Sequence, residues 1–218
     1  MSSAYGIIPK PVSNISLDTI LPISKTLRNG TKATLQQVDP NNQALVSVLR
    51  HLVNYEINMG STYPQEHELD EEGFTSYFLA YDSFVLVKDD PIVPGKEYDM
   101  HDKVLGCFYV KPNYPGRCSH IANGGFFVST VHRGFGAGIA MGESFPQIAS
   151  ALGYQASVFN LVFQNNEASI KIWRRLGFKE AGRIPKAGRL ENSPGKLVDA
   201  IIFYKDFTEQ NEETDVDK

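Results

Sequence analysis

Residues 123–142 of the chain read NGGFFVSTVHRGFGAGIAMG, and this stretch decides the predicted fold. Its first part, residues 124–128, is an apolar and aromatic run typical of a β-strand. A glycine-rich, cationic turn follows at residues 132–138 (HRGFGAG). From residue 139 onward, apolar residues recur at intervals of three and four, which predicts a helix. A strand therefore leads into a helix through a corner whose backbone N–H groups can surround a phosphate.

The glycine spacing limits the nucleotide that this corner can bind. Glycines at positions 134, 136 and 138 do not give the G-x-G-x-x-G spacing of a dinucleotide fingerprint, and no Gly-Lys-Ser or Gly-Lys-Thr follows, as a Walker loop requires. The remaining pattern, Arg133-x-x-Gly136-x-Gly138, resembles the pyrophosphate loop of the GNAT superfamily of acetyl-CoA-dependent N-acetyltransferases. For this stretch alone, a tight turn without a ligand is the alternative.

Composition limits the size of the domain and the classes of function that the chain can have. The chain has 218 residues, 42% of them hydrophobic, which suffices for the core of one domain. A net charge of −4 argues against a nucleic-acid binder. The two cysteines, Cys107 and Cys118, show no metal-ligand spacing, so we expect reduced, buried thiols and no metal site. Without an apolar run of about 18 residues or a leader, we expect a soluble, cytoplasmic protein that does not enter membranes, with a mitochondrial fraction left open.

Periodicity and turn residues predict an α/β fold in a single domain. Strands are expected at residues 33–38, 83–87, 104–111, 124–128, 156–163 and 197–204. Helices are expected from residue 41 or 42, at 69–79, from 139 and from 165 to 176, and residues 89–103 are expected to form a hairpin or surface loop. The predicted organisation is a loosely attached arm at 1–26, whose packing on the domain is left open, the domain at 27–208 and an acidic, disordered tail at 209–218.

A second motif lies at residues 166–178. It begins with Asn166, continues as an amphipathic helix and ends with Leu176-Gly177-Phe178, where the glycine suits a helix C-terminus. It resembles the second signature of the GNAT superfamily, and the two signatures occur here in the right order. The resemblance implies the GNAT fold, a central mixed and mostly antiparallel sheet with splayed central strands and helices on both faces.

Further segments give a closer resemblance. KPNYPGRCSH, NGGFFV, FNLVF, KIW and DAII look like the fungal N-acetyltransferases that detoxify azetidine-2-carboxylate and related proline analogues. The likeness runs from Leu27 to Asp206 and implies a homodimer. It also implies transfer of acetyl from acetyl-CoA, through a tetrahedral intermediate, to a small cyclic secondary amino acid. A protein or polyamine acetyltransferase and a non-catalytic CoA-binding sensor are the alternatives.

The resemblance also assigns roles within the site. The backbone N–H near Phe126 is expected to meet the oxyanion, provided that a bulge or splay frees it from the sheet. Asn123 is implied in substrate binding, completed by the backbone of Asn160 and Leu161. The residues expected to contact the cofactor are Phe126, Val128, Arg133, Gly134, Phe135, Gly136, Ala137, Gly138, Asn166 and Trp173. Lys171, Arg174 and Arg175 are further cationic candidates, although they equally suit a solvated helix face.

Two departures from the superfamily bear on the mechanism. Trp173 stands where many members have the tyrosine that protonates the leaving thiolate, and strand 122–128 lacks the carboxylate that some members use as a base. Asn166 remains, and its amide N–H₂ can donate to the sulfur, or it merely caps its helix. Deprotonation of the amine falls to water. Residues Tyr114, Arg117 and His120 are expected to border the acceptor pocket, or else to lie in a solvated loop.

Overall fold

The computed structural model describes residues 8–208, which form one eight-stranded sheet in the order β1-β2-β3-β4-β5-β6-β8-β7. Only the β5–β6 pair is parallel among the paired strands of these residues, so the predicted mixed, mostly antiparallel sheet is confirmed. The strands are β1 (Ile23–Thr26), β2 (Lys32–Gln37), β3 (Asp82–Lys88), β4 (Val104–Pro112), β5 (Ile121–Val128), β6 (Ala156–Phe163), β7 (Lys179–Arg189) and β8 (Leu197–Asp206).

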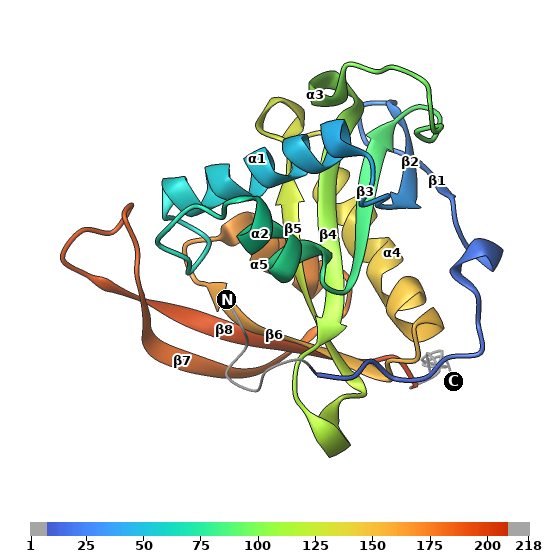
Figure 1. The fold of residues 1–218 in the computed structure, drawn as a ribbon. Coiled ribbons are helices and arrows are strands. Elements are labelled where there is room, and N and C mark those ends of the chain that lie inside the picture. Colours follow the sequence, from blue (N-terminus) through green and yellow to red (C-terminus); the bar gives the residue numbers. More distant parts are fainter. Residues whose placement is uncertain (1–7, 209–218) are drawn as a thin grey trace, which may run out of the picture.

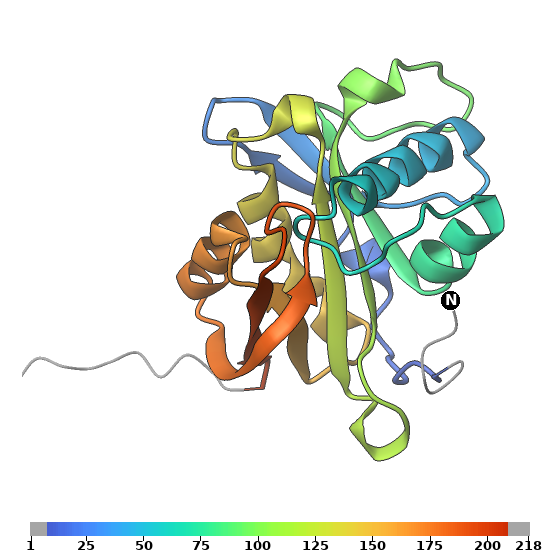
Figure 2. The same ribbon diagram turned by 90° about the vertical axis from the view of Figure 1, so that its left-hand side faces the viewer.

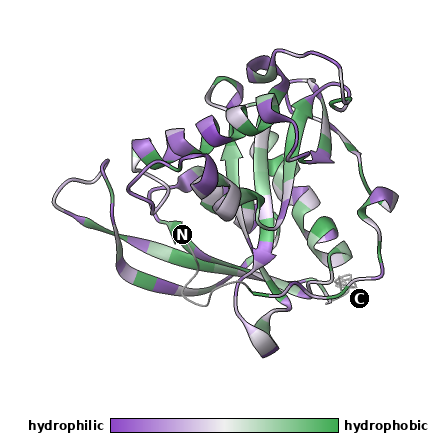
Figure 3. Ribbon diagram, in the orientation of Figure 1, coloured by the Kyte–Doolittle hydropathy of each residue, from purple (hydrophilic) through white to green (hydrophobic). Residues whose placement is uncertain are grey.

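Helices cover both faces of the sheet (Figures 1 and 2). The α-helices are α1 (Gln43–Met59), α2 (Glu71–Phe74), α3 (Met100–Lys103), α4 (Ala137–Ala151) and α5 (Glu167–Arg175). The short 3-10 and π turns are η1 (Leu17–Thr19), η2 (Thr75–Leu79), η3 (Gly116–Cys118) and η4 (Thr130–His132). The helices α1, α2 and α3 pack on one face, while α4 and α5 pack on the other. Figure 3 shows the apolar residues concentrated on the central strands between these layers.

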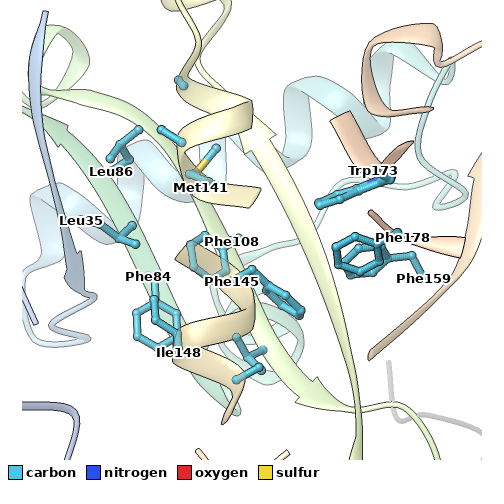
Figure 4. Close-up of a cluster of buried hydrophobic side chains, with 14 of the residues drawn as sticks. Leu35, Phe84, Leu86, Phe108, Met141, Phe145, Ile148, Phe159, Trp173 and Phe178 are labelled. Carbon is cyan, nitrogen blue, oxygen red and sulfur yellow. The ribbon is translucent and has the colours of Figure 1, made fainter. Parts of the chain in front are cut away.

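Aromatic side chains fill the core between the sheet and helices α4 and α5. Phe108 stacks on Phe126 with ring centroids 5.1 Å apart, and Trp173 lies 4.3 Å from Phe159. Figure 4 shows Trp173, Phe159 and Phe178 grouped beside this layer. Gly142 lets α4 approach α5 closely, since a Cβ there would lie 2.7 Å from a methyl group of Leu176. This packing fixes α5, and with it the side chains at its first turn, against the sheet.

The N-terminal segment is better attached than its composition predicts. Residues 23–26 form β1 and pair with β2, so the boundary predicted at residue 26 falls inside the sheet. Upstream, Lys10 forms an ion pair of 2.9 Å with the buried Asp82, and Ile8 is only 4% exposed. Residues 8–26 therefore pack on the domain, the possibility that the composition left open, because backbone pairing and the ion pair of Lys10 with Asp82 hold the segment. The predicted tail at 209–218 lies outside the described residues.

Three further expectations need correction. Cys107 is buried but Cys118 is exposed, because it lies in the turn η3 between β4 and β5. Part of the loop predicted at residues 89–103 is the helix α3, which Asp99 caps. Strand β7 was not predicted, because its residues are mostly exposed and show no apolar alternation.

Candidate active site

The site is built where β5 and β6 separate. Their parallel pairing consists of Ile121 with Ala156 and Ala122 with Ser157, and it ends there. Beyond these residues β5 stays with β4, while β6 follows β8 away from it, as Figure 1 shows. The predicted splay of the central strands is therefore present. It opens a gap that is edged by backbone groups of both strands.

The backbone N–H of Phe126 faces this gap. In the antiparallel β4–β5 ladder, the N–H of Asn113 donates to the carbonyl of Ile121 over 2.8 Å. Hydrogen-bonded and non-hydrogen-bonded pairs alternate along such a ladder, which makes Phe108 and Phe126 a non-hydrogen-bonded pair. The N–H of Phe126 therefore points away from β4, on the side where β6 has already diverged.

Strand β6 contributes an irregularity opposite this point. Its pairing with β8 shifts register between Phe159 and Val162, so that Asn160 and Leu161 form a bulge. A bulge leaves backbone groups outside the regular ladder and re-aims the side chains. Asn160 and Leu161 thereby border the gap between the two strands.

Two cavities meet in this gap. A large cavity of about 780 Å³ extends over the glycine-rich loop, and a small cavity of about 330 Å³ lies beside β4, β5 and β6. Both volumes lie in the range of small-molecule sites. The residues that line both cavities are Thr62, Phe126, Asn166, Ser169 and Trp173. The two predicted catalytic residues, Phe126 and Asn166, thus lie at the junction.

The loop before α4 is shaped for an anion. Gly134 and Gly136 have φ of 81° and 101°, values that suit glycine, and they turn the chain into the helix. Gly136 is the N-cap of α4, and no side chain caps the first N–H groups of that helix. Uncapped N–H groups at the positive end of a 15-residue helix fit a phosphate. The predicted contact residues Val128, Arg133, Gly134, Gly136, Ala137 and Gly138 all line the large cavity.

Phe135 is the exception within the predicted loop. It does not line the large cavity, and its side chain is 39% exposed. Its carbonyl accepts a hydrogen bond from the N–H of Arg28, whose guanidinium also donates to the carbonyl of Gly134 over 2.9 Å. Phe135 therefore anchors the loop through its backbone, and Arg28, in the segment after β1, holds the loop in place.

Cationic side chains surround the large cavity. Arg133 forms an ion pair with Glu56 of α1, and Lys171 pairs with Glu167 over 2.9 Å. Of the three cations expected on α5, Lys171 and Arg175 line the cavity but Arg174 does not, because it is paired with Glu180. The sequence reading did not assign Lys25, Arg28 or Glu56 to the site, although they also line the cavity.

A network of amides lies at the edge of the small cavity. Asn113 and Asn160 exchange two hydrogen bonds of 2.9 and 2.5 Å, and the Asn123 amide donates to Asn113 over 2.9 Å. The Oδ1 of Asn123 accepts from the N–H of Gly124. The network fixes the orientation of Asn123 and leaves one of its N–H donors for a ligand. Sequence reasoning assigned Asn123 and Asn160 to the site but missed Asn113, which joins them.

Three tyrosines form the opposite wall of the small cavity. The hydroxyl of Tyr77 lies 3.1 Å from that of Tyr109 and also bonds to that of Tyr63. Burial, reinforced by the neighbouring phenols, raises the pKa of Tyr63 and Tyr109 well above the usual value. The phenols of Tyr63 and Tyr109 therefore stay protonated and neutral. None of them was predicted, because they come from three separate segments.

The loop between β4 and β5 was placed wrongly. Tyr114, Arg117 and His120 line neither cavity. Their loop joins β4 to the start of β5 (Figure 1), whereas the cavities open where β5 has separated from β6. The solvated-loop alternative holds for Tyr114 and Arg117, which are exposed.

Asn166 caps a helix and also borders both cavities. It is the N-cap of α5, where its Oδ1 accepts the N–H of Ser169 over 3.1 Å. Its amide N–H₂ donates to no residue between 8 and 208, and the side chain borders both cavities. The cap uses the oxygen and leaves the nitrogen available, so capping and hydrogen-bond donation to a ligand are compatible.

Comparison with known proteins identifies this arrangement. A model of the Acetyltransferase (GNAT) family matches residues 53–178, more than half of the chain. The chain belongs to this family. N-acetyltransferase aca1 of Schizosaccharomyces pombe is 41% identical over 173 residues, which cover 77% of this chain and 82% of aca1.

Solved structures support the GNAT fold. A GCN5-related N-acetyltransferase from Kribbella flavida has a TM-score of 0.67 at 23% identity, and the match covers 80% of this chain and 97% of that one. The yncA structure from Salmonella typhimurium, solved with acetyl-CoA, has a TM-score of 0.66 at 17% identity over 82% and 95% of the two chains. The protein is thus an acetyltransferase that uses acetyl-CoA, which confirms the enzyme class over the non-catalytic alternative.

The described residues contain neither a membrane-spanning helix nor a metal-ligand cluster. Between residues 8 and 208, no helix is both long and apolar enough to cross a membrane. The same residues contain no group of three or more His, Cys, Asp or Glu side chains arranged to hold a metal ion.

The geometry of the loop predicts how charge reversal affects acetyl-CoA binding. Arg133→Glu should weaken acetyl-CoA binding by roughly 10- to 100-fold, because a charge-assisted contact is replaced by a repulsive one beside Glu56. Isothermal titration measures the effect. Arg117→Glu is the control of equal charge change outside both cavities and should bind like the wild type. Equal affinities of the two variants would contradict this assignment of Arg133.

Proposed function

We propose that the protein acetylates the nitrogen of a small cyclic secondary amino acid, such as azetidine-2-carboxylate or another proline analogue. The observation that carries this proposal is the junction of the two cavities at Phe126 and Asn166. The large cavity suits the extended, anionic co-substrate, and the small cavity of about 330 Å³ suits a compact acceptor. The likeness to fungal proline-analogue acetyltransferases supports the same acceptor, and it also implies a homodimer.

The lining of the small cavity bears on the alternative acceptors. Within the described part of the chain, its polar lining residues are neutral except for one lysine, and no Asp or Glu lines it. A polyamine site needs carboxylates to compensate the charges of its ligand. A cavity without acids therefore favours an acceptor that carries negative charge, and its small volume argues against a peptide segment.

The junction residues divide the chemistry between them. When bound, acetyl-CoA supplies a thioester whose carbonyl carbon bonds to the acceptor nitrogen as the carbon–sulfur bond breaks, and the proton on that nitrogen passes to water. The N–H of Phe126, free of the β4 ladder, is placed to stabilise negative charge on the carbonyl oxygen. The amide of Asn166 is placed to donate to the departing sulfur. A thiolate of pKa about 8.5 leaves without full protonation, so a neutral donor is sufficient.

Substrate recognition falls to the opposite edge of the small cavity. The amide of Asn123, held by Asn113 and Gly124, presents its remaining N–H to the acceptor. The bulge at Asn160 and Leu161 offers backbone groups outside the ladder. Because these groups are fixed before the substrate binds, little ordering is required on binding.

An acceptor panel tests the proposal. Thiol release from acetyl-CoA should be fast with azetidine-2-carboxylate and proline analogues, and close to background with spermidine and a histone peptide. Spermidine should fail because the described lining of the small cavity offers no carboxylate to compensate its charges, and the peptide should fail because the cavity is too small. Preferential turnover of spermidine or the peptide would overturn the proposal.

The two asparagines should affect different kinetic constants. Asn123→Ala should raise KM for the amine by roughly 10- to 100-fold, the effect of losing a hydrogen bond to a charged group. Asn166→Ala should instead lower kcat by about 10²-fold, because its donation matters only as charge develops on sulfur. Steady-state kinetics separates the two effects.

Asn166→Asp is the matched control for the second substitution. Aspartate retains an oxygen that accepts the N–H of Ser169, so the helix cap survives, but an aspartate carboxylate cannot donate a hydrogen bond. A low kcat in this variant, with unchanged thermal stability, supports donation to sulfur. A kcat equal to that of the wild type would show that capping is the whole role of Asn166.

The lining of the small cavity also predicts the pH dependence. Among residues 8–208 no Asp, Glu or His lines it, and the raised pKa of Tyr63 and Tyr109 keeps these two phenols protonated near neutrality. The reactive species is the neutral amine, so kcat/KM should rise about tenfold per pH unit from about pH 6 to 9, below the pKa of the acceptor ammonium. A plateau that begins near pH 7 would instead require a general base with a pKa in that range.

A further inference from the structure

We propose that Lys111 binds the carboxylate of the acceptor and thereby makes the enzyme selective for amino acids over neutral amines. This inference rests on the proposed function and adds to it the residue that reads the acid group. Lys111 lies at the end of β4 and, of the Lys and Arg side chains between residues 8 and 208, it alone lines the small cavity. The likeness to known acetyltransferases assigned it no role.

The position of Lys111 follows from the β4–β5 register. Lys111 pairs directly with Asn123, so their side chains lie side by side on one face of the sheet. The next pair on that face is Tyr109 with Gly125. A Cβ on Gly125 would lie 2.6 Å from the Tyr109 ring, so the glycine lets this ring lie across β5. The Tyr109 ring thus fills the space next to Lys111 on this face of the sheet.

The ammonium of Lys111 has aromatic neighbours but no anion. Its Nζ lies 4.6 Å from the ring centroid of Tyr77 and 4.7 Å from that of Tyr109. Among residues 8–208 it forms no ion pair and donates no hydrogen bond, and no carboxylate lines its cavity. Three cations of the large cavity differ in this respect, since Lys25, Arg133 and Lys171 each have a glutamate partner.

This environment selects an anionic ligand. The rings of Tyr77 and Tyr109 contact the ammonium on one side, and its N–H donors are left for the cavity. An ammonium in a partly desolvated cavity without an acid gains most from a ligand that brings a carboxylate. The neighbouring amide of Asn123 supplies a second donor to the same region, so that an amino acid is held by its acid group with its nitrogen free to react.

The test compares an acid with its isosteric amide. For the wild type, kcat/KM with azetidine-2-carboxylate should exceed that with azetidine-2-carboxamide by roughly 10- to 100-fold, the effect of one charge-assisted contact. In Lys111→Met, which keeps the length of the side chain, this ratio should fall toward one, while Lys111→Arg should retain the preference. Lys96→Met is the matched control, since Lys96 lies 5.3 Å from the ring centroid of Tyr98 outside both cavities.

The outcomes separate this inference from the proposed function. If the wild type acetylates neither compound, the proposed substrate class is wrong. If it acetylates both with a ratio near one, or if Lys111→Met keeps the wild-type ratio, the role of Lys111 is overturned. An equal loss of kcat/KM with the acid and with the amide would show that Lys111 only supports the cavity wall. That result would also overturn its proposed role in binding the carboxylate. Acetyl-CoA affinity of each variant, measured by titration, reports whether the large cavity is still folded.

Discussion

The whole active site depends on where hydrogen bonding between β5 and β6 stops. Two register pairs join the strands at their start, and beyond them each strand keeps only its outer neighbour. The right-handed twist of the sheet then carries the strands apart. Backbone groups that a continuous sheet would satisfy are left facing a gap, and the cavities that border Phe126 and Asn166 occupy that gap. The two cavities therefore meet within the sheet, at Phe126 and Asn166.

Features that depend on neighbours in the chain were predictable from the sequence. The strand at residues 156–163 has the predicted bounds, and the glycine-rich loop and the helix start at Asn166 lie where the sequence patterns put them. Features that depend on partners distant in the sequence were not predictable. Strand β7 has little apolar character of its own and exists through its pairing with β8.

The acceptor side of the site shows the same limit. Tyr63, Tyr77 and Lys111 come together because η2 packs over β4, and no spacing in the sequence encodes this. Arg117 and its neighbours were misplaced because closeness to β5 along the chain does not imply closeness to the end of β5 that opens. Side-chain chemistry could be read from the sequence, but the strand register that decides which side chains meet could not.

The ion pair between Arg133 and Glu56 has a consequence for competition among anions. Glu56 is also held by the hydroxyl of Thr62 over 3.0 Å, so the carboxylate is fixed beside the loop before any ligand arrives. An entering phosphate must take the guanidinium from a partner that already neutralises it. A small anion gains little by this exchange, whereas a long ligand offsets the cost through its other contacts along the cavity. The carboxylate thus lowers the gain that an anion obtains from Arg133, and this weighs more on inorganic phosphate than on a long ligand with further contacts.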